Sequence, residues 1–388
     1  MKKIVWWSES FLPTVGGGSS YVNDMIQLLD GYSHEVITQP IDGFPSEEYL
    51  EENLHIRRSN HFLRRRIDII NNIKFLSFAK SLLTEINGIR DKISYLKNKD
   101  SDIFFLLGMP MYSTLHNFKK YTTIDLHNYF LDFSSIKSPK IMTLCNLPHE
   151  FDNHPVILES YNHFINQFET IICIDKHIYD YCKKYSNSFG INNNIHFIPV
   201  SINTDKFFFK SLKFGKKIVL GFAGRLGNTV DLNIINKLIL NLPSNINLHL
   251  AVSGDMNLLN IPDSKLNQIR IFKDISSQMM PSFYHGIHIL LNPILHKAMT
   301  YVTLEAMACG RPVIMYNLND NETPKDNIDG FIINRDIKEL LDLLSHLSNN
   351  TSIISKIGKQ AFKTIKNKYS NKIIKPQIKK IFQNLLSI

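Results

Sequence analysis

The chain of 388 residues is longer than one hydrophobic core usually organises, so its length favours two domains of similar size. Its net charge of +9, from 44 basic and 35 acidic residues, favours anionic partners, but no nucleic-acid-binding module accompanies that charge. The four cysteines lack Cys-x-x-Cys spacing, which argues against a zinc site and a disulfide framework.

The first residues combine two lysines with a short apolar segment, as a secretory signal does. Ser8 and Glu9 interrupt that segment before it reaches the length of a signal-peptide core. No apolar run of the chain is long enough to span a bilayer. We therefore interpret Lys3 to Trp7 as a first β-strand and expect a cytoplasmic protein.

A glycine loop follows this expected strand. Gly16, Gly17 and Gly18 precede apolar residues at helical spacing from Tyr21 to Leu29, and His34 to Thr38 is typical of a second strand. Strand, loop, helix and strand form a βαβ unit, which predicts a parallel sheet with right-handed crossovers. The loop is not the G-x-G-x-x-G of dinucleotide-binding proteins, but its glycines let a backbone approach a ligand closely.

A basic segment comes next, with five arginines within ten residues: Arg57, Arg58, Arg64, Arg65 and Arg66. An apolar-periodic stretch from Ile67 to Phe78 follows it. A basic segment that leads an amphipathic helix can rest on an anionic membrane, at the inner face of the cell membrane for a cytoplasmic protein. A solvated helix face is an equally good interpretation.

The rest of the chain continues to alternate strands and helices. Further strands are expected at 103–107, 122–126, 140–144, 170–174 and 195–199, and then at 218–223, 248–252, 269–272, 287–291, 312–316 and 330–333. Residues 200–217 have little periodicity and are interpreted as the linker. The pattern predicts two α/β halves.

The segment from Asn292 to Val313 carries the most specific information. A strand end and a polar loop lead into Thr303 to Ala308, a run of strong helix formers that Gly310 terminates. We expect Glu305 in the first turn, where unpaired backbone N–H groups favour a phosphate and a carboxylate can accept hydrogen bonds from ribose. The segment thus indicates a seat for a nucleoside diphosphate. The alternative is an ordinary buried helix with a solvated glutamate.

This segment resembles the E-A-M-A-x-G-x-P-V signature of retaining glycosyltransferases of the large "glycosyl transferases group 1" family. The resemblance implies an α/β fold with two Rossmann-like domains facing a cleft, the GT-B architecture. It implies an acceptor-side domain over residues 1–205, a donor-binding domain over 206–372, and a C-terminal helix, 373–388, whose family counterpart often crosses back to the N-terminal domain. The implied activity moves a sugar from a nucleotide-diphosphate donor to an acceptor hydroxyl with retention.

Two positions depart from the family pattern. The Gly-Arg-Leu motif of the family is present with Arg225, but the lysine expected five residues later is Val230. A second glutamate is usual eight residues before Glu305, and Lys297 occupies that position. We interpret Lys297 as a replacement for the missing phosphate-binding charge.

The resemblance also implies roles for the other candidate residues. The catalytic candidate is His127, at the end of an expected strand, and its rival is Cys145 with His149 nearby. The diphosphate would meet the N–H groups of Tyr301 and Val302, and the base would stack near Lys273 to Ile275. The complete donor-binding set is Gly16, Gly17, Arg225, Lys297, Thr300, Tyr301, Val302, Glu305 and Ile275. No cofactor and no metal is expected, since protein cations and dipoles would replace the metal.

The implied role is the synthesis of a bacterial cell-surface glycan such as lipopolysaccharide, capsule or glycoprotein, with a glycan, lipid-linked or protein acceptor. A non-catalytic relative that binds a nucleotide or glycan and supports a partner transferase is the main alternative, because Lys297 and Val230 alter the site. A sugar-nucleotide epimerase on the same fold is a third, which the motifs favour less.

Overall fold

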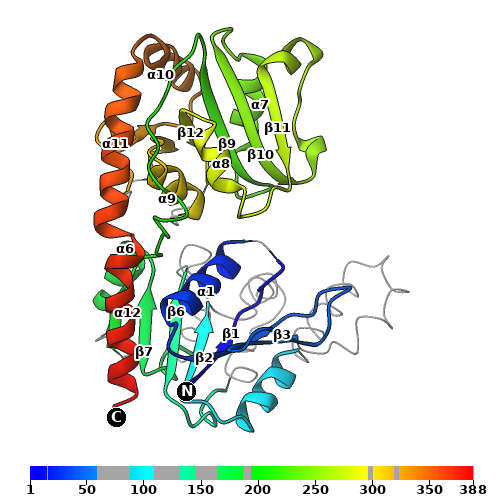
Figure 1. Ribbon diagram of the computed structural model, residues 1–388, viewed down its shortest axis with the longest axis vertical. Helices are drawn as coiled ribbons and strands as arrows, with labels where there is room; N and C mark the ends of the chain where they lie inside the picture. Colours follow the sequence, from blue (N-terminus) through cyan, green and yellow to red (C-terminus); the bar gives the residue numbers. More distant parts are fainter. Residues whose placement is uncertain are drawn as a thin grey trace. The chain divides into compact units, whose positions relative to one another are not determined.

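The computed structural model describes residues 1–14, 16–58, 88–108, 132–145, 164–186, 194–295, 300–318 and 323–387 (Figure 1). The chain forms two compact units. The first contains residues 1–199 and 375–388, and the second contains residues 200–374. The sequence had placed the two boundaries after residues 205 and 372.

The first unit is built on an eight-stranded sheet with the order β3-β4-β2-β1-β5-β6-β7-β8. All of its neighbouring strands pair in parallel except β3 and β4, which are antiparallel. The strands are β1 (Lys3–Trp7), β2 (Ser33–Thr38), β3 (Glu47–Glu51), β4 (Leu54–Arg58), β5 (Ile103–Leu107), β6 (Lys140–Leu144), β7 (Thr170–Cys173) and β8 (Asn194–Phe197); helices α1 (Gly17–Leu28), α6 (Lys176–Ser186) and most of α12 (Asn371–Leu385) belong to the same unit.

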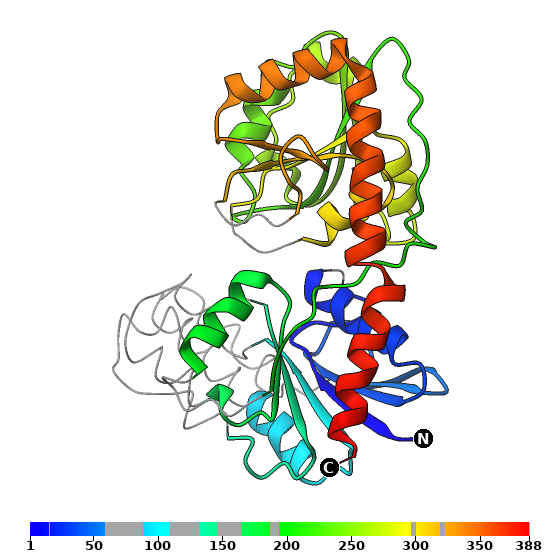
Figure 2. The same cartoon turned by 90° about the vertical axis from the view of Figure 1, so that its left-hand side faces the viewer.

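Two adjacent tryptophans of β1 anchor the two faces of this sheet, because successive side chains of a strand point to opposite sides. Trp6 contacts Phe105 and Phe382, with ring centroids 4.5 and 6.5 Å away, and Phe382 belongs to α12. Trp7 packs instead against Phe133, at 5.6 Å. Helix α12 therefore covers the Trp6 face of the sheet, as Figure 2 shows.

The second unit has a six-stranded parallel sheet with the order β11-β10-β9-β12-β13-β14. Its first strand, β9, lies in the middle of the sheet. The chain adds β10 and β11 on one side of β9 and then crosses to the other side, where it adds β12, β13 and β14. In open α/β sheets, ligands bind at the carboxyl ends of the strands where the order reverses in this way. We call the carboxyl ends of β9 and β12 the switch point. The elements are β9 (Ile218–Leu226), α7 (Leu232–Leu240), β10 (Ile246–Gly254), the 3-10 helices at Met256–Leu258 and Asp263–Gln268, β11 (Ile269–Lys273), α8 (Met280–His285), β12 (Ile289–Asn292), α9 (Tyr301–Ala308), β13 (Val313–Tyr316), β14 (Phe331–Ile333), α10 (Ile337–Asn349) and α11 (Thr351–Lys368).

Helices α9 and α11 pack closely because two glycines meet where they approach each other (Figure 1). A Cβ atom at Gly358 in α11 would overlap the carbonyl oxygen of Gly310, which follows α9. Gly310 has φ +77°, a conformation in which glycine is favoured. Gly310 of the signature therefore ends α9 and also lets the backbone of α11 approach closely.

Candidate functional site

Helix α9 begins at the switch point, and a buried polar network fixes its first turn. Thr300 is the N-cap, and its hydroxyl accepts a hydrogen bond from the backbone N–H of Thr303. The side-chain amide of Asn292, the last residue of β12, donates to the hydroxyls of Thr300 at 2.9 Å and Thr303 at 2.7 Å. The Thr303 hydroxyl donates to the sulfur of Met315 at 3.6 Å. The start of α9 is thus held against the ends of β12 and β13.

Glu305 is the fifth residue of α9, so the prediction that it lies in the first turn is wrong. The helix begins at Tyr301 because Thr300 caps it, and this cap adds two residues before Thr303. The half-buried carboxylate of Glu305 lies two residues further along the helix than expected. Its Oε2 accepts a 2.8 Å hydrogen bond from the hydroxyl of Tyr284, which is fully buried in α8.

The environment of Tyr284 keeps its hydroxyl protonated. Burial, and then the charge of Glu305, raise the pKa of Tyr284 well above its ordinary value. At neutral pH the phenol therefore donates and the carboxylate accepts. The bond restricts the rotamers of Glu305 and holds its charge in one place.

Arg311 holds the backbone that carries Tyr284, although the side chain of Arg311 is almost completely buried. Helix C-termini expose carbonyl groups and carry partial negative charge, which a buried cation can satisfy. Burial lowers the pKa of Arg311 to about 10, so the guanidinium remains charged at neutral pH. It donates to the carbonyl oxygens of Lys210, Tyr284, His285, Ile287 and Cys309. Arg311, which occupies a variable position of the signature, therefore ties the end of α8 to the end of α9.

Arg225 lies at the carboxyl end of β9, next to β12 in the sheet. Its side chain is exposed, and the residues that the structure describes offer it no hydrogen bond or ion pair. Gly254, at the end of β10 with φ +90°, contacts the stem of Arg225: a Cβ at Gly254 would lie 3.6 Å from Cγ of Arg225. An unpaired guanidinium at the switch point is suited to bind phosphate oxygens.

Val230 belongs to the hydrophobic core of the second unit, where a lysine had been expected from the family pattern. The loop around it crosses the end of β12: Val230 forms an antiparallel bridge with Ile294, Asp231 N–H donates to Pro293, and Leu295 N–H donates to Thr229. Lys297 itself lies outside the described residues. Ile294 and Leu295, which precede Lys297 in the sequence, lie beside the segment that carries Val230.

Asp231 joins this loop to the neighbouring strands. Its Oδ1 caps α7, and its Oδ2 accepts a 3.0 Å hydrogen bond from the hydroxyl of Tyr316 and pairs with Arg335 at 3.3 Å. Arg335, which follows β14, is therefore already paired with a carboxylate. Arg225 remains the better placed residue for an anion.

The other members of the predicted donor set lie on different elements of the two units. Tyr301 and Val302 form the first turn of α9 and are half-buried. Ile275 follows β11, the edge strand that β10 separates from β9. Gly16 is the N-cap of α1 in the first unit and Gly17 is its first residue, and a Cβ atom at either would meet no described atom beyond its chain neighbours within 4 Å. Among the described residues, no steric constraint explains these two glycines.

The predicted catalytic histidine cannot be placed, because His127 and the rival His149 lie outside the described residues. Cys145 follows β6, and burial raises the pKa of its thiol to about 12. Cys145 is therefore a protonated thiol at neutral pH.

The arginine cluster is only partly described, and its described members are bound within the protein. Arg57 pairs with Glu47 at 2.8 Å, and its guanidinium lies 4.0 Å from the ring centroid of Tyr95. Arg58 is buried and pairs with Glu48 at 2.8 Å. Both lie at the end of strand β4. The expected amphipathic stretch after them lies outside the described residues, so the membrane contact stays a prediction. Arg64, Arg65 and Arg66 lie outside the described residues, and no helix among the described residues is long and apolar enough to cross a membrane.

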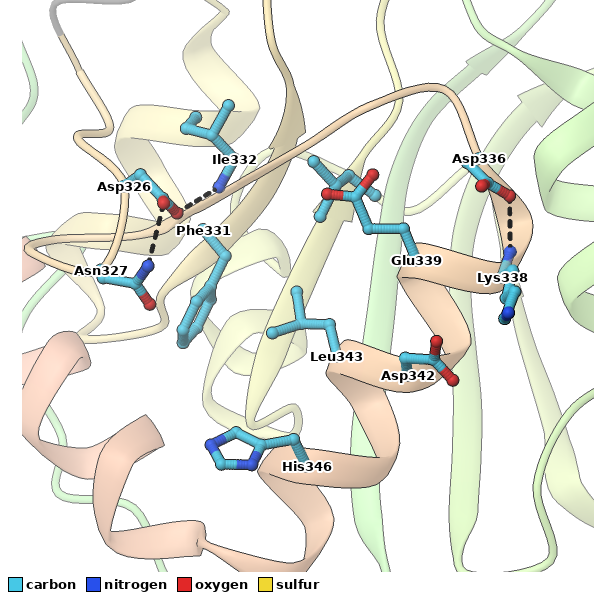
Figure 3. A pocket seen from close by; sticks show the side chains of 11 residues that line it. Asp326, Asn327, Phe331, Ile332, Asp336, Lys338, Glu339, Asp342, Leu343 and His346 are labelled. Carbon is cyan, nitrogen blue, oxygen red and sulfur yellow. Dashed lines mark hydrogen bonds between the residues drawn. The ribbon is translucent and has the colours of Figure 1, made fainter.

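A cavity of about 530 Å³ lies between β14 and α10, but its chemistry does not suit a diphosphate (Figure 3). Four carboxylates line it together with one lysine, one histidine and apolar side chains, and the excess of negative charge would repel an anionic ligand. Its acidic residues are Asp326, Asp336, Glu339 and Asp342. None of the predicted donor-site residues lines it.

Comparison with known proteins agrees with this arrangement. Residues 217–350 match the family described as "Glycosyl transferases group 1". The capsular polysaccharide biosynthesis glycosyltransferase CapM of Staphylococcus aureus is 25% identical over 209 residues, which are 51% of this chain and 54% of CapM. The chain thus spans about half the length of this curated relative.

Solved structures match over nearly the whole chain. Sucrose-phosphate synthase from Thermosynechococcus elongatus superposes with a TM-score of 0.75 at 12% identity, covering 100% of both chains. Anabaena HepE, solved in complex with UDP-glucose, superposes with a TM-score of 0.67 at 13% identity and covers 99% of this chain and 100% of its own. The fold is that of GT-B glycosyltransferases. The match of residues 217–350 to the glycosyl transferases group 1 family lies within the second unit.

Proposed function

We propose that this protein transfers a sugar from a nucleoside-diphosphate donor to an acceptor hydroxyl. The observation that carries the proposal is the hydrogen bond between Tyr284 and Glu305 on the helix that begins at the switch point. Arg225 lies at the same switch point, and no hydrogen bond or ion pair engages its side chain among the described residues. The match of residues 217–350 to group 1 glycosyl transferases supports the same reaction class.

The residues have distinct roles in this reaction. The bond between the anomeric carbon and the β-phosphate oxygen breaks and a bond from the anomeric carbon to the acceptor oxygen forms. The proton of the acceptor hydroxyl passes to the leaving phosphate and from there to solvent. The leaving phosphate gains negative charge, which Arg225, Lys297 and the first N–H groups of α9 stabilise. Glu305 accepts hydrogen bonds from the ribose, and the base lies near Ile275. Gly16, Gly17 and His127 are assigned to the site on the family resemblance alone.

Three finer features belong to the proposal. The donor is a uridine diphosphate sugar, by analogy with the UDP-glucose bound to HepE. The acceptor belongs to a bacterial cell-surface glycan, by analogy with CapM. The transfer retains the anomeric configuration and needs no metal, because the cation and dipole at the switch point neutralise the diphosphate. Proton NMR of the product determines the configuration, and turnover that persists in excess chelator supports metal independence.

The direct test offers the protein a panel of sugar nucleotides and measures release of the nucleoside diphosphate with and without a glycan acceptor. We expect one donor to be consumed and an acceptor to speed its consumption. Glu305→Gln should abolish most of this turnover without changing the fold. If no sugar nucleotide is consumed although nucleotides bind, the proposed transferase activity is wrong.

Nucleotide binding without consumption of any sugar nucleotide would support the alternative, a non-catalytic relative that binds nucleotides. The observation in its favour is Val230, which occupies a core position where the family has a phosphate-binding lysine. Nucleotide binding with no turnover, even over long incubation and with every donor, would identify this alternative.

A further inference from the structure

The positive charge of this protein is concentrated at its C-terminal end. Residues 351–388 contain nine lysines and no acidic residue, and the whole chain has a net charge of +9. The preceding 350 residues are therefore electrically balanced. The excess charge belongs to one short part of the chain, which contains helices α11 and α12.

Four of these lysines form a row along one face of α11. They are Lys356, Lys359, Lys363 and Lys366, at spacings that place them on the same side of a helix. All four are exposed. The opposite face of the helix is buried, with Ile354, Ile357, Ala361 and Ile365 in the interior. The row extends over about 15 Å at the rise of an α-helix.

Within the described part of the chain, the lysine row has no neutralising partner. Lys375 and Lys379 of α12 both pair with Asp30, at 2.7 and 2.9 Å. By contrast, no ion pair joins the row to any acidic side chain in the described part of the chain, and α11 itself contains no acidic residue. Four like charges on one helix face repel one another, and a helix gains nothing from that arrangement alone. The row is therefore suited to an external anion.

The composition of the row indicates what kind of anion it meets. It contains lysine and no arginine, so it offers mobile point charges instead of the planar forks that recognise a fixed phosphate or carboxylate. No exposed aromatic side chain interrupts it, as stacking on nucleic-acid bases would require: Phe362 packs against Phe209, with ring centroids 5.2 Å apart. A diffuse layer of charge matches these properties, and the headgroups of an anionic bilayer form such a layer.

We propose that the lysine row of α11 docks the protein on the surface of an anionic lipid bilayer. The contact is electrostatic and peripheral. It lies on the second unit and does not involve the arginine cluster of the first.

Sedimentation with lipid vesicles tests this inference on the full-length protein. Vesicles of phosphatidylcholine mixed with phosphatidylglycerol should bind the protein, and vesicles of phosphatidylcholine alone should not. Each lysine near such a surface strengthens binding roughly fivefold, so replacing all four by glutamine should weaken it on the order of several hundredfold. Raising the salt concentration should release the wild-type protein, because the charges are exposed to screening.

A charge-matched variant separates the row from net charge. Lys213, Lys216, Lys217 and Lys237 are exposed lysines elsewhere on the second unit, and their replacement by glutamine removes the same charge. This control should keep most of the vesicle binding, and both variants should melt at the wild-type temperature. Equal loss in the two variants would overturn the inference. So would binding to soluble dextran sulfate without binding to anionic vesicles, since the row would then serve a polyanionic chain.

Discussion

The hydroxyl of Tyr284 donates a 2.8 Å hydrogen bond to Oε2 of Glu305, and this contact joins α8 to α9. Arg311 holds the same tyrosine by its backbone carbonyl, at 2.8 Å. A buried cation therefore fixes a backbone, the backbone places a phenol, and the phenol orients the carboxylate that is proposed to bind the donor. The orientation of Glu305, within the E-A-M-A-C-G-R-P-V segment, thus depends on Tyr284, which lies outside that segment.

Tyr284→Phe should weaken donor binding roughly fivefold, because it removes the hydrogen bond that orients Glu305 while it keeps the ring in the core. The apparent affinity for the sugar nucleotide measures this effect. Tyr369→Phe is the matched control, since the buried hydroxyl of Tyr369 donates to Thr323 at 3.0 Å, away from Glu305. Equal donor affinity in the two variants would show that Tyr284 contributes only to stability.

Arg225→Ala should lower turnover by about ten- to a hundredfold, and Arg225→Lys by less, because lysine keeps the charge without the planar fork. Arg270→Ala is the control for loss of an exposed arginine from the same unit. Arg270 lies within β11 over the ring of Phe272, not at a strand end. Turnover that is unchanged in Arg225→Ala would remove this residue from the site.

Lys297→Ala should weaken donor binding if Lys297 supplies the charge that is absent at position 230. A lysine at 230 would enter the core, so the compensating change belongs at Thr229, which is exposed and accepts a hydrogen bond from Leu295 N–H. Thr229→Lys should recover part of the lost affinity in the Lys297→Ala background and add little to the wild type. A double-mutant cycle on donor affinity measures this coupling. Additive effects would mean that the two loops do not share a ligand.

His34 should make the first unit less stable in mild acid. Trp6 Nε1 donates to Nδ1 of His34 at 3.1 Å, so Nε2 carries the proton and donates to Leu29 O. Burial lowers the pKa of His34 to about 4. In the unfolded state the imidazole binds a proton below about pH 6.5, whereas in the folded state it does so only below about pH 4. The free energy of unfolding therefore decreases as the pH falls across this range, by up to about 3 kcal/mol.

Urea unfolding followed by tryptophan fluorescence tests this dependence, because both tryptophans of the chain lie in β1 of the first unit. His34→Gln should lose less stability than the wild type as the pH falls from 6.5 to 4. Parallel losses in the two proteins would assign the acid sensitivity to other groups.

Most strands could be predicted because buried strands of parallel sheets are continuous apolar runs between turn signals. The expected strands at 103–107 and 140–144 are observed with the same limits. The pair β3 and β4 was missed, since Glu47–Glu51 is a charged edge strand that exists through its pairing with β4. The two arginines of β4 that pair with Glu47 and Glu48 of this strand had been assigned only to the basic segment.

The site could be predicted only where its residues are close in the sequence. The helix formers and Gly310 located α9, but its start depends on the Thr300 cap and on the Asn292 side chain that holds it. Tyr284 precedes Glu305 by 21 residues, and no local pattern distinguishes it from a core tyrosine. Arg311 was visible in the signature, but its role in satisfying five carbonyl groups emerges only from the packing of α8 against α9.

Calorimetric titration with UDP tests most directly the claim that the switch point of the second unit binds the donor nucleotide. The account predicts that the wild-type protein binds UDP and that Glu305→Gln weakens binding tenfold or more, through loss of charge-assisted hydrogen bonds to ribose. Asp342→Asn, in the acidic cavity between β14 and α10, should leave the affinity unchanged. Unaltered binding by Glu305→Gln, or a loss confined to Asp342→Asn, would contradict the assignment.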